Sequence, residues 1–185
     1  MNVMVSLREA TRSMHIRLEK RLTIKDRFSE LACYRDHLAL LLGFYAIAEA
    51  RWSEALAPAL SDLSARCKTV QLARDLAAVG GTQVPGAIVP AMANTAAALG
   101  GFYVLEGATL GGQHLLPLVE RRLDLSASHG ASDLASYGSD VGPMWQRFGA
   151  AVESHCQTAD AAGSAIAGAQ ATFQAMENWL CGAPA

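Results

Sequence analysis

The sequence Gly100-Gly101-Phe102-Tyr103-Val104-Leu105-Glu106-Gly107-Ala108-Thr109-Leu110-Gly111-Gly112-Gln113 lies inside a segment that otherwise favours a helix, and it carries five glycines in fourteen residues. Each glycine in a helix interior costs about 1 kcal/mol relative to alanine, because it loses more backbone freedom on folding. A helix that keeps so many glycines is therefore expected to use the missing side chains. It can bend there, or it can place its backbone directly against another flat body.

Three of these glycines, Gly107, Gly111 and Gly112, are close enough in sequence to be predicted on one broad face of the helix. That face would present bare backbone. A close crossing of two helices would use it, and so would a ligand with a large flat face. The ligand interpretation requires a second wall with its own chemistry.

The first predicted helix begins at a capping box formed by Ser6 and Glu9, in which each side chain accepts a hydrogen bond from an exposed backbone N–H. A mainly apolar stripe at helical spacing follows and is expected to face the core. Its members are Leu7, Thr11, Met14, Leu18 and Leu22.

Three further side chains of this helix flank the stripe. His15 projects about 80° from the direction of Leu7, while Arg8 and Arg12 project about 100° and 140° from it. Taken singly, such a histidine is usually a packing residue and such arginines are usually solvated. Together, an apolar surface, one nitrogen ligand and two cations suit a flat apolar molecule with a metal at its centre and carboxylates at its rim.

The rest of the chain is predicted to form further helices joined by short breaks, with about six helices in all. The expected ranges are 29–57, 63–79, 91–123 with an interruption at Pro117, 142–156 and 164–181, and residues 125–138 are expected to form a loop with one helical turn. His37 is expected to be structural or exposed, and His129 is expected on the surface. Because no segment of useful length alternates with period two, the predicted fold class is all-α, with one domain over residues 1–185.

Composition and charge exclude several classes of function. The chain is 51% hydrophobic and only 17% charged, which suits a protein with a lined apolar pocket. A net charge of −2 argues against general binding to nucleic acid or to a membrane surface. The four cysteines show no zinc-binding spacing, and no stretch of 18 residues is free of polar groups. The expected location is the cytoplasm.

Two stretches carry a resemblance to a known family. They are Leu7-Arg8-x-x-Thr11-x-x-x-His15-x-x-Leu18-Glu19 and Tyr103-Val104-Leu105-Glu106-Gly107-Ala108-x-Leu110-Gly111-Gly112-Gln113, with Gly142-x-x-Trp145-x-x-Phe148 in support. The chain resembles the bacterial, biliverdin-producing haem oxygenases. This resemblance implies a helical haem-oxygenase-like fold in which haem lies between a proximal and a distal helix.

The resemblance also implies roles for individual residues. His15 matches the proximal ligand of the haem iron, and Arg8 and Arg12 match basic residues directed toward the haem propionates. Gly107, Gly111 and Gly112 match the glycines of the distal helix, where the reaction occurs. Ala108 departs from the family pattern, because mammalian members have aspartate there and many bacterial members have serine. The distal hydrogen-bond network is therefore expected to be built differently in this chain.

The implied reaction consumes haem, O₂ and electrons and yields biliverdin, CO and free iron. The chain has no nucleotide-binding glycine loop, so an external ferredoxin or reductase is expected to supply the electrons. The biological purpose of the reaction is left open between two alternatives, the supply of biliverdin to a bilin-binding photoreceptor and the release of iron. Three alternatives remain: a haem carrier on the same fold, a cofactor-free helical interaction protein, and a thiaminase-like hydrolase, which would need an activated cysteine.

Overall fold

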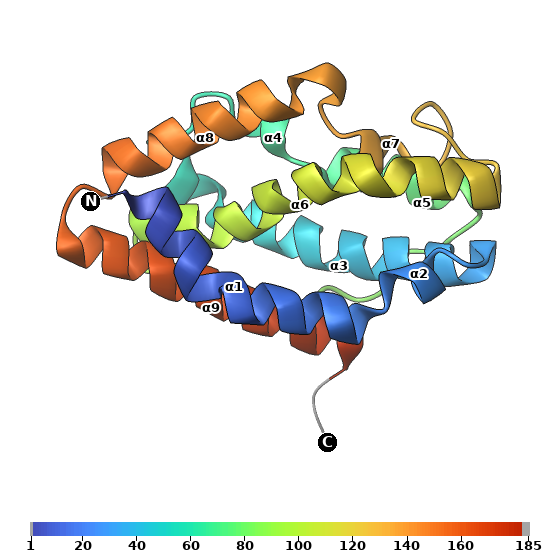
Figure 1. Ribbon diagram of the computed structural model, residues 1–185, viewed down its shortest axis with the longest axis horizontal. Helices are drawn as coiled ribbons and strands as arrows, with labels where there is room; N and C mark the ends of the chain where they lie inside the picture. Colours follow the sequence, from blue (N-terminus) through green and yellow to red (C-terminus); the bar gives the residue numbers. More distant parts are fainter. Residues whose placement is uncertain (1, 183–185) are drawn as a thin grey trace.

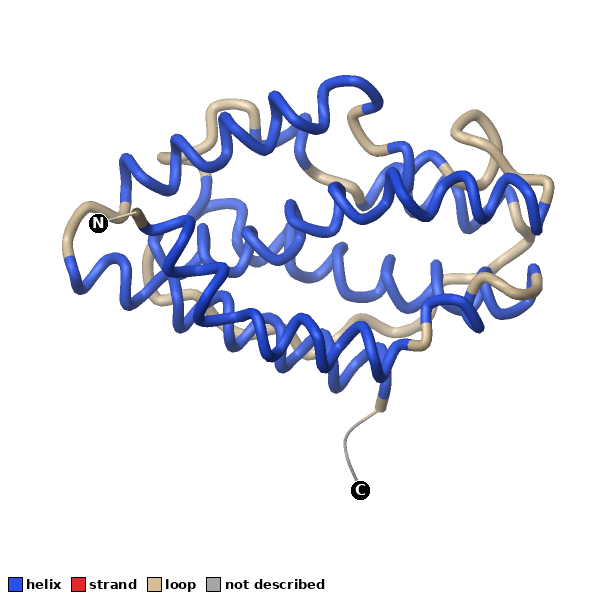
Figure 2. Tube along the Cα trace, viewed as in Figure 1, coloured by secondary structure: helices blue, strands red, loops and turns tan. Residues whose placement is uncertain are grey.

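The computed structural model describes residues 2–182, and this part of the chain contains helices and loops but no strand (Figure 2). The helices are α1 (Val3–Leu22), α2 (Ile24–Arg27), α3 (Leu31–Leu56), α4 (Leu63–Arg66), α5 (Thr69–Ala78), α6 (Thr95–Leu123), α7 (Ser132–Ala135), the 3₁₀ helix η1 (Gly138–Asp140), α8 (Val141–His155) and α9 (Ala159–Cys181). Six of them are ten residues or longer, so the predicted all-α class with about six main helices is confirmed.

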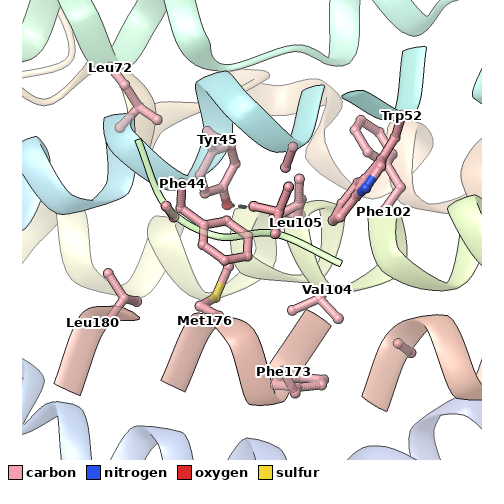
Figure 3. Close-up of a cluster of buried hydrophobic side chains, with 14 of the residues drawn as sticks. Phe44, Tyr45, Trp52, Leu72, Phe102, Val104, Leu105, Phe173, Met176 and Leu180 are labelled. Atoms are coloured by element: carbon pink, nitrogen blue, oxygen red, sulfur yellow. Dashed lines mark hydrogen bonds between the residues drawn. The ribbon is translucent and has the colours of Figure 1, made fainter. Parts of the chain in front are cut away.

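Helix α6 runs through the middle of the molecule, with α8 above it and α1 and α9 below it in the view of Figure 1. Helix α9 packs against both α1 and α6, and α3 packs against α5, α6 and α9. Figure 3 shows the core where α3, α6 and α9 meet, with Trp52, Phe102 and Met176 among its side chains. One contiguous hydrophobic cluster supports the predicted single domain, which stays a prediction.

The first part of the glycine-rich stretch lies at a tight crossing of α6 and α9. A Cβ atom at Gly100 would collide with the backbone carbonyl of Ala165. The reciprocal contact has the same form, since a Cβ atom at Gly168 would collide with the carbonyl of Ala97. The sequence offered a close helix crossing as one use of the face of Gly107, Gly111 and Gly112, and the structure shows such a crossing at Gly100 instead.

Helix α1 begins one turn earlier than the sequence predicts. The side chain of Asn2 caps it by accepting from the N–H of Val5 at 3.0 Å. Glu153 of α8 accepts from the N–H groups of Val3 and Met4 at 3.1 and 2.8 Å. The predicted capping box at Ser6 is wrong, because a carboxylate 150 residues away satisfies the exposed N–H groups further upstream.

The core stripe of α1 is confirmed, since Leu7, Thr11 and Leu18 are buried and the remaining two members are partly buried. In contrast, the helix predicted over 63–79 is two helices, α4 and α5. The carboxylate of Glu49 separates α4 from α5, because it accepts hydrogen bonds from the N–H groups of Lys68 and Thr69 and so caps the start of α5.

Helix α6 also differs from its predicted limits. It begins at Thr95, four residues late, because the side chain of Asn94 accepts from the N–H of Ala97 at 2.8 Å and caps it. Pro117 lies within α6 without ending it. Its ring is on an exposed side of the helix, where the unpaired carbonyl of the preceding turn can bond to water.

Helix α3 is long and apolar enough to cross a membrane by length and composition. Half of its most apolar window is buried inside the fold, as in the core helix of a globular protein. Its side chains Phe44 and Trp52 point into the core in Figure 3.

Candidate functional site

A cleft of about 630 Å³ lies between α1 and α6, with α8 and α9 closing its sides. This volume is in the range typical of cofactor and small-molecule sites. Most of the lining is apolar, and the residues that line the cleft are Arg8, Thr11, Arg12, His15, Ile16, Leu18, Tyr103, Val104, Gly107, Ala108, Leu110, Trp145, Phe173 and Met176. The two stretches singled out in the sequence therefore form its two facing walls.

The α1 wall brings together the three side chains that the sequence predicted, His15, Arg8 and Arg12. The imidazole of His15 is 57% exposed, so it is accessible from the cleft. Its Nδ1 lies 3.5 Å from Oε2 of Glu19, one turn further along the helix. Its ring meets Phe173 edge to face, with 6.0 Å between the ring centroids.

The other histidines of the chain do not line the cleft. His37 is buried against Phe28, with 5.6 Å between the ring centroids, and burial lowers its pKa to about 3, so it stays neutral. Of the two positions expected for His37, structural or exposed, the structure shows the structural one. His129 is exposed, as predicted, and His114 and His155 are exposed as well. Among residues 2–182, His15 is therefore the one that offers an imidazole to the cleft.

The α6 wall contains Gly107 and Ala108. A Cβ atom at Gly107 would lie 3.9 Å from the ring of Trp145, and one at Gly111 would meet nothing within 4 Å. This part of α6 therefore presents bare backbone to open space. These positions are glycine although the protein's own atoms leave room for a larger side chain.

Gly112 does not share this face. It is buried, and a Cβ atom there would lie 2.8 Å from the carbonyl oxygen of Leu134 in α7. The prediction of one face with three glycines is wrong for this residue, because five residues along an α-helix correspond to a rotation of about 140° from Gly107. Gly112 allows α7 to approach α6, on the side away from the cleft.

Tyr103 and Trp145 line the cleft, but the sequence did not assign them to the site. Tyr103 is half-buried and lies one turn before Gly107, and its ring is 5.5 Å from that of Trp145. Burial raises the pKa of Tyr103, so the hydroxyl stays protonated and can donate a hydrogen bond. The spacing of four residues between Tyr103 and Gly107 could have found Tyr103, whereas Trp145 entered the sequence analysis only as part of the motif Gly142-x-x-Trp145-x-x-Phe148.

A buried polar cluster lies behind α6, and sequence reasoning missed it. Arg66 of α4 is 1% exposed and pairs with Glu106 of α6, which is 2% exposed, at 2.8 Å. Tyr137 donates to the other oxygen of Glu106 at 2.6 Å. Burial works against the charge of Arg66, but the bonds to Asp62 and the charge of Glu106 outweigh it, so its pKa lies above the ordinary value. No sequence pattern links these residues, because the pair is 40 positions apart.

Fold and cleft together define an all-α protein that joins one accessible imidazole, two guanidiniums and an apolar surface, the set of groups suited to haem. Comparison with known proteins gives the family. The sequence profile described as heme oxygenase matches residues 1–181, so the chain belongs to the haem oxygenase family. A heme oxygenase from Xanthomonas campestris pv. campestris (strain 8004) is 34% identical over 143 residues, which cover 75% of this chain and 81% of that protein.

Solved structures agree with the fold. The NO- and CO-bound heme oxygenase from Neisseria meningitidis has a TM-score of 0.87 and 23% identity, and the match covers 100% of this chain and 94% of that one. The heme oxygenase from Leptospira interrogans has a TM-score of 0.79 and 19% identity, with 98% and 99% covered. The predicted resemblance, the all-α fold and haem oxygenase activity are thereby confirmed.

Proposed function

We propose that the cleft between α1 and α6 binds haem as the substrate, with His15 as the axial ligand of its iron. The observation that carries this assignment is that His15 is the single imidazole lining the cleft among residues 2–182. Its Nδ1 faces the carboxylate of Glu19. A carboxylate partner on one ring nitrogen orients a metal-bound imidazole and raises its basicity, which leaves Nε2 for the iron.

The other residues of the cleft fit the rest of the macrocycle. Arg8 and Arg12 supply two fixed positive charges for the propionates. Phe173 and Met176 of α9 offer apolar surface for the ring, and they exclude water from it. Gly107 and Gly111 would form the distal wall, where the absence of side chains leaves room for O₂ between backbone and ring. Gly112 acts there indirectly, through the packing of α6 on α7.

When bound, haem supplies the iron that activates O₂ and is itself the porphyrin that is opened to biliverdin, CO and free iron. The protein has to position the ring and bring protons to the distal side. Ala108 lines the cleft but has no group that donates a hydrogen bond. The neighbouring hydroxyl of Thr109 is directed away, since it donates to the carbonyl of Glu106 at 2.7 Å. Distal protons would therefore come from water that backbone carbonyls and polar side chains of the cleft hold, and not from a side chain at position 108.

Electrons come from a separate ferredoxin or reductase in this proposal, since the sequence has no nucleotide-binding glycine loop. We place the protein in the cytoplasm, with biliverdin passing to a bilin-binding photoreceptor or with iron release as the purpose. The hydrolase alternative loses support from the thiols. Burial raises the pKa values of Cys67, Cys156 and Cys181, which is the opposite of an activated nucleophile.

The test is the reaction of the purified protein with haem, a reductant and O₂, followed through the Soret band and the absorption of bilin products. We expect bilin formation by the wild type, and a changed ferric spectrum without turnover in His15→Ala. His129→Ala is the matched control, because that imidazole is exposed and outside the cleft. Stable haem binding without any bilin would favour the haem-carrier alternative that Ala108 suggests. An unchanged spectrum and normal turnover in His15→Ala would contradict the assignment of the ligand.

A further inference from the structure

Arg66 connects two elements of the cleft from behind. Its guanidinium lies in the interior between α4, α6 and α8, where Nη1 donates to Oε2 of Glu106 at 2.8 Å and to the carbonyl of Met144 at 3.3 Å. Its Cζ atom lies 5.8 Å from the centroid of the Phe148 ring. One side chain thus holds the back of α6 and the back of α8 at the same time.

Both contacts lead directly to the distal wall. Glu106 immediately precedes Gly107 on α6. Phe148 stacks on Trp145 with 5.8 Å between the ring centroids and an angle of 28° between the planes. Trp145 is in turn the nearest group to the open side of Gly107. Arg66 therefore reaches Gly107 through Glu106, and it reaches Trp145 through Phe148.

The remaining bonds of the cluster leave little freedom to its members. Arg66 donates through Nε and Nη2 to the two carboxylate oxygens of Asp62 at 2.7 and 2.9 Å. Tyr137 donates to Oε1 of Glu106 at 2.6 Å, and the ammonium of Lys68 lies 3.4 Å from the centroid of the Tyr137 ring. Such a network is rigid because every member has a partner.

Stability alone does not account for a buried ion pair at this place. Removing two charges from water is costly, and replacing such a pair by apolar residues of similar volume is often neutral or stabilising. An apolar pair would fill the space but would not fix the direction or the distance between two helices. Hydrogen bonds of defined geometry do both.

We infer that Arg66 and Glu106 are positioning residues that set the separation of Gly107 from Trp145, and thereby the geometry of the distal side of the haem cleft. This inference rests on the proposed placement of haem between α1 and α6. An error of about 1 Å in the placement of a reacting group can cost on the order of 10²-fold in rate. Loss of the Arg66–Glu106 pair should therefore lower turnover more than it lowers the affinity for haem.

The decisive variant is the double substitution Arg66→Met with Glu106→Leu, which keeps the volume and removes both charges. We expect a melting temperature of the haem-free protein close to that of the wild type. In the haem-free double variant, the amides of residues 107–113 should exchange their hydrogens about tenfold faster than in the haem-free wild type. The kcat of the double variant should fall by roughly 10- to 100-fold, with a small change in KM for haem. Wild-type exchange together with wild-type kcat would overturn the positioning role.

Two further variants keep the test sharp. Glu49→Gln removes a buried carboxylate that caps α5 and does not touch the distal wall, so it should lower the melting temperature and leave exchange at 107–113 unchanged. Tyr137→Phe deletes one hydrogen bond to Glu106 but keeps the aromatic ring under Lys68. This variant tests the positioning role if the double variant does not fold. We expect about twofold to tenfold lower kcat from it. A kcat equal to that of the wild type would count against the inference.

His15→Ala separates this inference from the proposed site. If His15→Ala loses the ferric spectrum while the double variant is indistinguishable from the wild type, the site stands and the positioning role fails. If His15→Ala keeps a normal spectrum and turnover, the site assignment fails and the role of Arg66 in a distal wall fails with it.

Discussion

Two halves of α6 use the same residue for opposite purposes. At Gly100 the missing side chain is filled by another helix, because a Cβ atom there would collide with the backbone of Ala165. At Gly107 and Gly111 the missing side chain is filled by no part of the described protein, since a Cβ atom would meet only Trp145 at 3.9 Å or nothing within 4 Å. The comparison teaches that Gly100 in the first half packs the fold together, whereas Gly107 and Gly111 in the second half leave a surface that the protein itself does not cover.

The largest effect is expected from Gly100→Ala. The added methyl group would push against a backbone carbonyl that cannot move aside, so we expect a loss of about 3 kcal/mol or more in the free energy of unfolding. For a chain of this size this corresponds to roughly 6–12 °C in melting temperature. Gly163→Ala is the matched control on α9, where nothing lies within 4 Å of the added atom. A Gly100→Ala protein as stable as the wild type would remove the distinction between the two halves.

The next effect is on turnover and not on stability. Gly107→Ala and Gly111→Ala should not lower the melting temperature of the haem-free protein. Their free energy of unfolding should rise by about 0.4–1 kcal/mol, because alanine restricts the unfolded chain more than glycine does. Turnover should fall by up to about 10²-fold if the added methyl displaces the ring or the bound O₂. The measurement is a pair of values, the melting temperature and the rate of bilin formation. An unstable variant with normal turnover would place these glycines in a packing contact.

Gly112→Ala tests the side of α6 that the sequence assigned wrongly. The methyl group would lie 2.8 Å from the carbonyl of Leu134, so α7 has to shift. Because α7 is a single turn between loops, we expect a modest loss of about 1 kcal/mol, or 2–4 °C in melting temperature. The ferric haem spectrum should change less than in Gly107→Ala. A larger spectral change from Gly112→Ala than from Gly107→Ala would return Gly112 to the distal face.

The smallest effect is expected at Ala108, which is exposed and lines the open half of α6. Ala108→Ser should keep the fold and the rate of bilin formation, or raise that rate, since a hydroxyl can hold a distal water. Ala108→Leu should slow turnover without loss of stability, because it fills the cleft from the same wall. Full activity in Ala108→Leu would mean that this wall does not face the reacting part of haem.

The amino-acid sequence by itself determined what depends on neighbours along one helix. The stripe of α1 and the placement of His15, Arg8 and Arg12 beside it follow from a period of 3.6 residues, which holds wherever a regular helix forms. The same local rule predicted the main helices and the glycine-rich backbone. The identity of α1 and α6 as facing walls came from the resemblance of their motifs to the haem oxygenases, and not from periodicity.

Only the tertiary structure decided which element lies against each face. Helical periodicity gives the direction of a side chain about its own axis but says nothing of what lies in that direction. For this reason Gly100 and Gly107 look alike in the sequence, although one meets α9 and the other meets an open cleft. The cap of α1 by Glu153 and the pair of Arg66 with Glu106 depend on contacts between residues 40 or more positions apart. Such contacts exist only after the chain has folded, because loop closure and packing, rather than local preference, bring their partners together.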